Sequence, residues 1–392
     1  MTARLVGVEV GASKVPVTPA KPVYLAGLGH GRLSEGVHDD LYARALVICE
    51  GSKAITLVGV DSIGVMRDHL APLKEKLATR GVALLLSSTH DHSSPDTIGL
   101  WGPEPGVSGF DDEYMELLLS GVEEAVEKAL EEVERGALEL GSAALPRGVA
   151  KNTRNPELLD REISYIVARS GGRVLGTLVN FGLHPEVLWM DNRLVTADFV
   201  HYLCRELEGA LGGVAIFLNG ALGGMVTPDV VSHTFEEAER VGRAAARAVL
   251  ESVSRSKPRV EATCELALAS KLVELPVHNA VLAEAARVGV VKRGVGEPPT
   301  VETEVSVLEL RPLASLAALP GEPLPAVGLR VKGVLRSPYR FLVSLCNDEI
   351  GYIIGRDEWD PKRYEESMSL GPLTCEILLS ALGELLHTLR RG

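Results

Sequence analysis

The sequence predicts an α/β fold with a mixed β-sheet and flanking helices. Short apolar runs of strand length alternate with amphipathic segments of helical period. Strands are predicted at residues 42–49 and 54–61, and the polar turn between them predicts an antiparallel hairpin. A helix predicted at residues 68–79 links the second of these strands to another at residues 82–88. That connection is typical of a parallel βαβ crossover.

The same patterns continue to the end of the chain. Further strands are predicted at residues 5–11, 137–144, 163–169, 174–181, 214–218, 260–275, 302–312, 315–319 and 341–346. Helices are predicted at residues 111–135, with Gly136 as the stop, and at residues 197–211, 235–252, 279–288 and 373–390. We expect one large domain over residues 1–392, with functional side chains gathered at strand ends.

Charge and composition exclude several classes of function. With 53 acidic against 40 basic residues the net charge is −13, which argues against binding to nucleic acid or to an anionic membrane surface. No apolar stretch is long enough to span a bilayer, and residues 1–22 do not resemble a secretion signal, so we expect a cytoplasmic protein without an integral membrane segment. The absence of glutamine and the abundance of Glu and Arg predict a thermostable protein.

Two histidines follow the predicted buried strand at residues 82–88. If the extended backbone continues through His90 and His92, both imidazoles project to the same side. An imidazole pair at the carboxyl end of a buried strand suits a metal site. A hydrogen-bonded loop role for one of the two histidines is an equally weighted alternative.

Three other predicted strand ends carry possible metal ligands: His184, Glu322 and Tyr352. Each of them alone favours an ordinary loop or turn role, since a histidine before proline and a Pro-Gly-Glu turn are common. Their joint position at strand ends favours a shared site.

These motifs together resemble the neutral ceramidase family, the zinc-dependent N-acylsphingosine amidohydrolases. The segment Thr89-His90-Asp91-His92-Ser93-Ser94-Pro95 resembles the family's Thr-His-Thr-His-Ser-Gly-Pro. The other matching segments follow in family order: Gly36-Val37-His38, Phe181-Gly182-Leu183-His184-Pro185, Pro320-Gly321-Glu322, and Asn347 to Tyr352 followed by Arg363-Tyr364-Glu365. The resemblance covers essentially the whole chain.

The resemblance implies a zinc ion bound by His90, His184, Glu322 and Tyr352, with His92 beside the metal. It implies attack of zinc-bound hydroxide on an amide carbonyl, with His92 as the candidate acid and base. Tyr352 could instead stabilise the tetrahedral intermediate through its hydroxyl, and the sequence does not separate these two roles.

The resemblance also implies residues that bind the substrate. Arg154 resembles a family segment that reaches the substrate, His38 is expected near the substrate headgroup, and Tyr364 belongs to the same set. For His38 and Arg154, a plain loop or salt-bridge role is an equal alternative.

The sequence departs from the family pattern at one motif. The family's Gly-Asp-Val-Ser-Pro is replaced by Gly224-Met225-Val226-Thr227-Pro228. Thr227 keeps a hydroxyl and remains a candidate catalytic residue, whereas Met225 replaces the aspartate. We also expect no C-terminal immunoglobulin-like domain of the kind found in the family.

Three functional hypotheses follow. The first is a zinc-dependent amidohydrolase acting on a small or lipid N-acyl amide, such as an N-acylated sphingoid. The second is a zinc-dependent esterase or small-amide hydrolase. The third, favoured only by Met225, is a metal- or ligand-binding relative without catalysis. The sequence predicts no oligomeric state.

Overall fold

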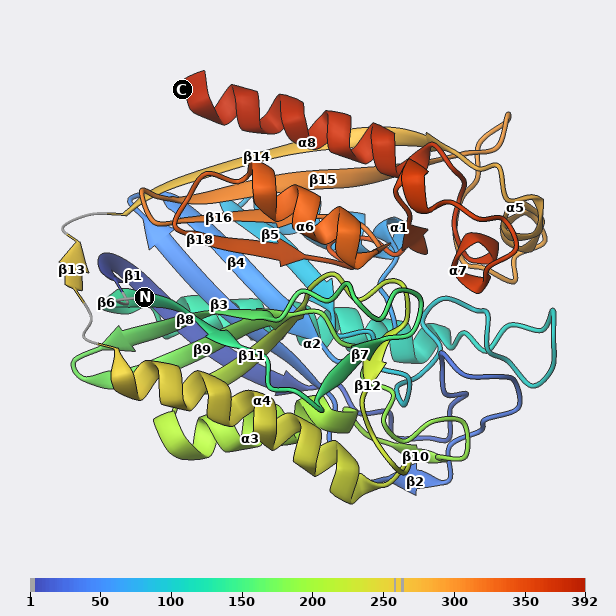
Figure 1. The fold of residues 1–392 in the computed structure, drawn as a ribbon, viewed down its shortest axis with the longest axis horizontal. Coiled ribbons are helices and arrows are strands. Elements are labelled where there is room, and N and C mark those ends of the chain that lie inside the picture. The colour runs from blue at the N-terminus through green and yellow to red at the C-terminus, as the bar shows by residue number, and fades with distance from the viewer. Residues whose placement is uncertain (1–3, 257–258, 262–263, 392) are drawn as a thin grey trace.

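The computed structural model describes residues 4–256, 259–261 and 264–391, and this part of the chain is arranged in four layers. Helices cover one face of a nine-stranded sheet, a four-stranded sheet packs on its other face, and further helices cover the four-stranded sheet (Figure 1). The predicted α/β fold with mixed sheets and flanking helices is confirmed.

The nine-stranded sheet has the order β11-β9-β8-β6-β1-β3-β4-β5, with β13 paired to β1. The bounds of its strands are β1 Arg4–Pro16, β3 Tyr42–Glu50, β4 Lys53–Val60, β5 Val82–Ser88, β6 Glu134–Ala144, β8 Glu162–Ser170, β9 Arg173–Phe181, β11 Val214–Asn219 and β13 Arg259–Glu261. The strands β3 and β4 form the predicted antiparallel hairpin, and β4 pairs with β5 in parallel as the crossover predicts.

Both faces of the nine-stranded sheet are buried. On β3, Ala45 and Val47 face a core shared with the helices α1 Arg67–Ala78, α2 Asp112–Glu131, α3 Asp198–Leu211 and α4 Phe235–Arg255. The alternate residues Leu46 and Ile48 face a second core, shared with the four-stranded sheet. Because successive side chains of a strand point to opposite faces, a strand buried on both faces reads as a continuous apolar run.

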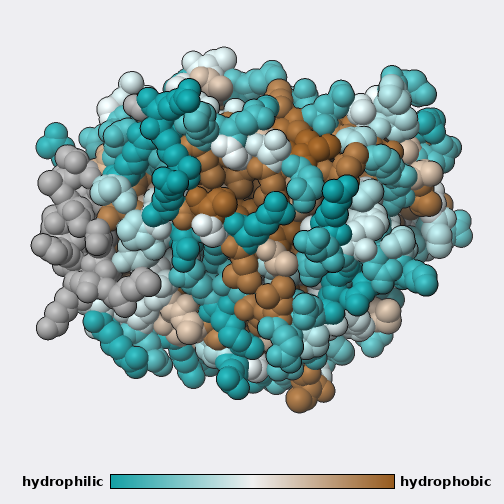
Figure 2. All heavy atoms as spheres, turned by 45° about the horizontal axis from the view of Figure 1, so that its top comes forward, coloured by the Kyte–Doolittle hydropathy of each residue, from teal (hydrophilic) through white to brown (hydrophobic). Residues whose placement is uncertain are grey.

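The four-stranded sheet has the order β14-β15-β16-β18. Its strands are β14 Glu265–Pro276, β15 Thr300–Arg311, β16 Ala314–Ala318 and β18 Tyr339–Val343, and the helices α6 Pro325–Val334 and α8 Thr374–Arg391 cover its outer face. Figure 2 looks onto this side of the molecule and shows apolar side chains in an irregular band between hydrophilic ones. None of the helices in the described residues is long and apolar enough to cross a membrane.

Short elements complete the fold near the strand ends. They are three pairs of short strands, β2 Gly36–Val37 with β10 Leu194–Val195, β7 Ala150–Asn152 with β12 Val226–Pro228, and β17 Glu322–Pro323 with β19 Tyr352–Ile353, and the helices α5 Ala280–Arg287, η1 Arg356–Glu358 and α7 Tyr364–Ser367. The pairing of β17 with β19 sets Glu322 directly opposite Tyr352.

The bounds of two predicted elements are wrong. The helix predicted to reach residue 135 ends at Glu131, and Gly136 lies in β6, where a Cβ would lie 2.3 Å from the carbonyl oxygen of Arg169. Gly136 is therefore needed for close strand packing and does not end a helix. The strand predicted at residues 260–275 is divided between β13 and β14, which belong to different sheets, and residues 262–263 lie outside the described part.

Candidate metal centre and its pocket

The loops that carry His90 and His184 are tied together by Asn219, the last residue of β11. The Nδ2 atom of Asn219 donates hydrogen bonds to the carbonyl oxygens of Thr89 (2.8 Å) and Leu183 (2.9 Å). A side-chain amide with two donors can hold two chain segments side by side. Sequence reasoning missed Asn219, although a polar residue directly after a buried apolar run is a visible signal.

The backbone turns sharply at His90. The extended backbone under which both imidazoles would project to the same side does not continue, because β5 ends at Ser88 and His90 has a φ of 66°. The N–H groups of His90 (2.9 Å) and Asp91 (3.1 Å) both donate to the carbonyl oxygen of Ser62, which bends the chain around that atom. A left-handed conformation at a non-glycine residue is unfavourable and is common at functional sites.

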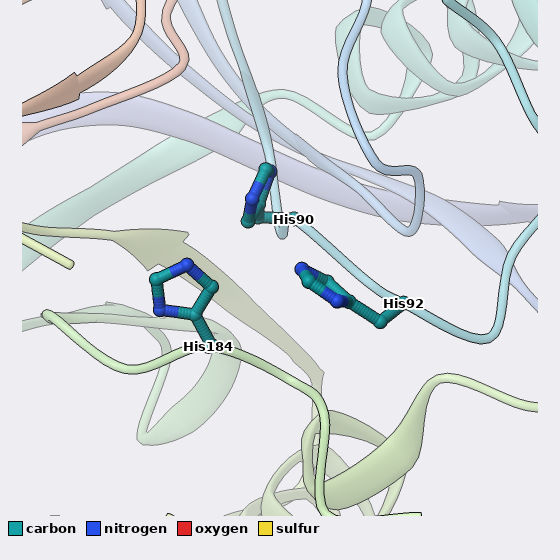
Figure 3. Close-up of side chains that lie close together, drawn as sticks. All are labelled: His90, His92 and His184. Carbon is teal, nitrogen blue, oxygen red and sulfur yellow. The ribbon is translucent and has the colours of Figure 1, made fainter. Parts of the chain in front are cut away.

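The imidazole rings of His90, His92 and His184 nevertheless converge, as Figure 3 shows. The ring centroids lie 5.0 Å apart for His90 and His92, 5.1 Å for His90 and His184, and 5.6 Å for His92 and His184. All three residues are buried. His90 and His92 therefore face one pocket, although the backbone achieves this by a turn and not by an extended strand.

Backbone carbonyl groups determine which nitrogen of two of these rings carries a proton. The Nδ1 atom of His90 lies 2.7 Å from the carbonyl oxygen of Ile63, and Nδ1 of His184 lies 3.0 Å from that of Val226. Because a carbonyl oxygen only accepts, both Nδ1 atoms must donate. The Nε2 atoms lie 3.4 Å (His90) and 3.1 Å (His184) from Oε2 of Glu322.

This contact requires a positive charge. A neutral imidazole that donates through Nδ1 presents a lone pair at Nε2, and Glu322 presents another, so the two would repel unless a proton or a metal ion lies between them. Burial lowers the pKa of His184, but the contact with Glu322 and the charge of Glu186 outweigh it and raise that pKa to about 8. Burial alone would raise the pKa of Glu322, but the interactions with His90 and His184 outweigh this effect and lower that pKa.

The residues present fit a metal ion. The donor atoms of His90, His92 and His184 lie within 4.8 Å of one another, and so do those of His90, Glu322 and Glu349. Neither ring nitrogen of His92 has a hydrogen-bond partner, nor has Oε2 of Glu349. Buried nitrogen and oxygen donors with unused lone pairs are the ligands that zinc prefers in catalytic sites. Sequence reasoning missed Glu349, although it is an acidic residue within the segment that carries Tyr352.

Tyr352 lies in the same cluster. Its hydroxyl donates to Sδ of Met225 (3.4 Å), and its ring is buried beside Glu322. Burial and the charge of Glu322 raise its pKa well above the ordinary value of 10.0. The phenol is thus protonated unless a cation binds next to it, because a bound cation favours the ionised form. This position is compatible with both predicted roles, metal ligand and oxyanion donor.

A largely apolar pocket opens beside the cluster. The residues His90, His92, Glu322, Glu349 and Tyr352 form its polar wall. The remaining wall is mostly apolar and includes Ile63, Met66, Ile98, Leu100, Trp101, Leu282 and Ala286. Tyr364 also lies on the wall, with its ring centroid 6.1 Å from that of Tyr352. Its predicted role in substrate binding stays a prediction.

Arg154 is absent from the described residues that line this pocket. Its guanidinium donates to Glu365 (2.9 Å) and to Glu366 (2.7 Å), both on α7. Because α7 begins with Tyr364, Arg154 anchors the helix that carries a wall residue. Its predicted contact with the substrate stays a prediction.

The remaining predicted residues, His38 and Thr227, are also absent from the described lining residues. His38 stacks on Phe235 with ring centroids 3.7 Å apart, and its Nδ1 lies 2.8 Å from Asp39. Thr227 lies on β12, where its hydroxyl neighbours Glu186 and opposes the rise in the pKa of Glu186 that burial causes. Their predicted substrate-binding and catalytic roles stay predictions.

A family model described as neutral/alkaline non-lysosomal ceramidase, N-terminal, matches residues 9–230 of this chain, more than half of its 392 residues. The chain belongs to this ceramidase family. The matched range contains His90, His92 and His184, whereas Glu322 and Tyr352 lie beyond it.

A neutral ceramidase of Pseudomonas aeruginosa is 25% identical over 226 residues, which are 50% of this chain and 33% of that protein. The match thus spans about a third of the length of this ceramidase relative. The crystal structure of neutral ceramidase from Pseudomonas aeruginosa superimposes with a TM-score of 0.82 at 17% identity, over 98% of this chain and 75% of that chain. A ceramidase complexed with C2 gives a TM-score of 0.81 at 17% identity, over 98% and 76% of the two chains. These structural matches establish a shared fold.

Proposed function

We propose that this protein is a zinc-dependent amidohydrolase that cleaves the amide bond of an N-acylated sphingoid or amine and releases a fatty acid and a free amine. The observation that carries the proposal is the meeting of His90 and His184 at the carboxylate of Glu322, beside a largely apolar pocket that His90 and Glu322 line. The Pseudomonas relative is named a neutral ceramidase, which supports a lipid amide as the substrate.

The residues that would hold zinc are His90, His184, Glu322 and Tyr352. Both histidines direct Nε2 toward Glu322 because their Nδ1 atoms donate to backbone carbonyl groups, an arrangement that orients metal-binding histidines in other proteins. Zinc, when bound, lowers the pKa of a coordinated water toward ~7 and polarises a carbonyl oxygen.

His92 is the proposed acid and base. Burial, together with His90 and His184, holds its pKa well below the ordinary value of 6.5, so the ring is neutral at pH 7. A neutral imidazole accepts a proton from the attacking water and then gives it to the departing amine nitrogen. Thr227 is set back from the pocket, which supports an indirect role through Glu186 over a role as nucleophile.

The apolar wall is the proposed site of the acyl chain. Ligand pockets are lined mainly by apolar side chains, and transfer of an alkyl chain from water to such a wall is favourable because it buries apolar surface. We also propose that residues 1–392 act as one domain, because a shared core joins the two large sheets.

The first test combines the metal content of the purified protein with hydrolysis of a fluorescent N-acyl sphingosine before and after chelation. We expect about one zinc per chain and cleavage that chelation abolishes and added zinc restores. A panel of short acyl esters and amides is measured alongside. A strong preference for those compounds would indicate that the substrate is a small ester or amide and not a lipid amide. Bound metal without any turnover would favour a binding protein. Absence of metal would contradict the proposal.

A further inference from the structure

A buried carboxylate that takes no direct part in the proposed reaction lies next to His92. The Oε2 atom of Glu186 is 3.5 Å from Nδ1 of His92, and the Glu186 side chain is fully buried. Neither oxygen of Glu186 receives a hydrogen bond that meets the usual geometric limits. A buried carboxylate with so little compensation lowers stability, so its presence requires another explanation.

The backbone holds Glu186 and His92 against each other. The N–H of His92 donates to the carbonyl oxygen of Pro185 (3.0 Å), and the N–H of Glu186 donates to that of His184 (3.0 Å). The tight turn at residues 184–186 is thereby attached to the loop that carries His92. The relative position of the carboxylate and the imidazole follows from the main chain.

Gly27 and Arg32 also contribute to the position of His92. Gly27 has a φ of 87°, and a Cβ at this position would lie 2.4 Å from Nδ1 of His92. Arg32 donates to the carbonyl oxygen of His92 (3.0 Å), which fixes the backbone of this loop. A glycine at position 27 therefore leaves room for the ring in this orientation, which any larger residue would obstruct.

We propose that Glu186 is a positioning residue that sets the tautomer and the direction of His92. A carboxylate accepts hydrogen bonds, so it favours the proton on Nδ1 and leaves the lone pair of His92 on Nε2. A donor atom of His92 lies within 4.8 Å of those of His90 and His184, so the free lone pair serves the metal cluster and the substrate beside it.

Glu186 also lies beside Thr227 on β12. The effect of Glu186 on turnover rests on the proposed hydrolase function, whereas its effect on the tautomer of His92 does not.

The tautomer is tested by nitrogen NMR on the metal-loaded protein labelled with ¹⁵N-histidine, with the His92 signals assigned by their loss in His92→Asn. In the wild type we expect a protonated Nδ1 and an unprotonated Nε2 for His92. In Glu186→Ala we expect both tautomers to be populated. The control is Glu139→Gln, which alters another buried carboxylate, on β6, and should leave the His92 signals unchanged. Identical His92 signals in Glu186→Ala and the wild type would overturn the inference.

Turnover provides a second readout. We expect Glu186→Ala to lower kcat by about 10- to 100-fold with little change in KM, and Glu186→Gln, which keeps an acceptor oxygen, to lose less. In a His92→Ala background Glu186→Ala should have no further effect, because a residue that acts through His92 loses its role with it. An undiminished effect in that background would contradict the inference. If no amide is cleaved by the wild type, the proposed function fails, and the NMR result still decides the role of Glu186.

Discussion

The Nε2 atom of His184 lies 3.1 Å from Oε2 of Glu322, although 138 positions separate them in the chain. The other nitrogen of the ring is held by the carbonyl oxygen of Val226, so the ring cannot turn its protonated nitrogen toward the carboxylate without losing that bond. A proton on Nε2 and a metal ion thus compete for one place. This competition leads to a prediction about pH.

Metal affinity should rise with pH up to about 8. The pKa of His184 is about 8 in the metal-free protein, so at lower pH a metal ion must displace its proton. One displaced proton weakens the apparent affinity by about 10-fold for each pH unit below that pKa. Calorimetric zinc titrations at several pH values, in buffers of different ionisation enthalpy, measure the apparent affinity and the number of protons displaced. An affinity that is constant between pH 6 and 8 would exclude this competition.

His90→Ala should remove the metal and the activity together. His90 belongs to both groups of clustered donor atoms, so its loss disrupts each of them. The matched control is His387→Ala on α8, which should retain the metal and the rate of the wild type. Metal analysis and the fluorescent amide assay measure the outcome. Full zinc content with full activity in His90→Ala would show that the site is assigned wrongly.

Glu349→Gln should raise the stability of the metal-free protein and weaken metal binding. Burial and the nearby charge of Glu322 raise the pKa of Glu349 well above 4.5, which shows that its ionised form is unfavourable without a cation. A neutral amide removes that repulsion, but it also removes a carboxylate next to the donor atoms and should cost about 10-fold in metal affinity. Thermal unfolding after chelation and zinc titration measure the two effects. Unchanged affinity would place Glu349 outside the metal site.

Ala286→Trp should shift the substrate preference toward shorter acyl chains. Ala286 lies on the apolar wall of the pocket, and an indole there fills space that a long alkyl chain would occupy. The control is Val231→Trp, at a residue that is 96% exposed, which should leave the preference unchanged. Rates for a series of N-acyl amides of increasing chain length provide the comparison. An unaltered chain-length profile would indicate that the acyl chain binds elsewhere.

Arg154→Ala should destabilise the protein and raise KM more than it lowers kcat. The guanidinium is paired with Glu365 and Glu366, and removal of one member of a buried ion pair costs about 3 kcal/mol. The exposed pair of Arg255 with Glu251 is the control, and Arg255→Ala should cost less than about 1 kcal/mol. Urea unfolding and steady-state kinetics separate the effects. A variant with unchanged KM would argue against anchoring of the Tyr364 wall by Arg154.

Part of the site was visible in the sequence because its signals are local. Apolar runs of strand length predicted β5 and β9, and the polar residues that follow them, His90 and His184, are easily recognised at strand ends. The α/β class likewise follows from the alternation of two periodicities. Glu322 and Tyr352 were predicted as metal ligands from the resemblance to a known family. No local pattern distinguishes the segments that carry them from ordinary turns.

Local patterns could not reveal contacts between distant segments. The division of residues 260–275 between two sheets depends on which partner each half meets, and Gly136 reads as a helix stop until the neighbouring strand is in place. The same holds for Glu186 and Glu349, whose significance lies in the side chains they face.

The sequence by itself determined the class of fold, the family and the histidines at the strand ends, because period, length and residue type are properties of short segments. Only the tertiary structure decided how these histidines are oriented and what surrounds them. The carbonyl groups of Ile63 and Val226 select the nitrogen that each ring presents, and Glu186 lies beside the third ring. Hydrogen bonds and charges act over a few ångströms in space, whatever the distance along the chain.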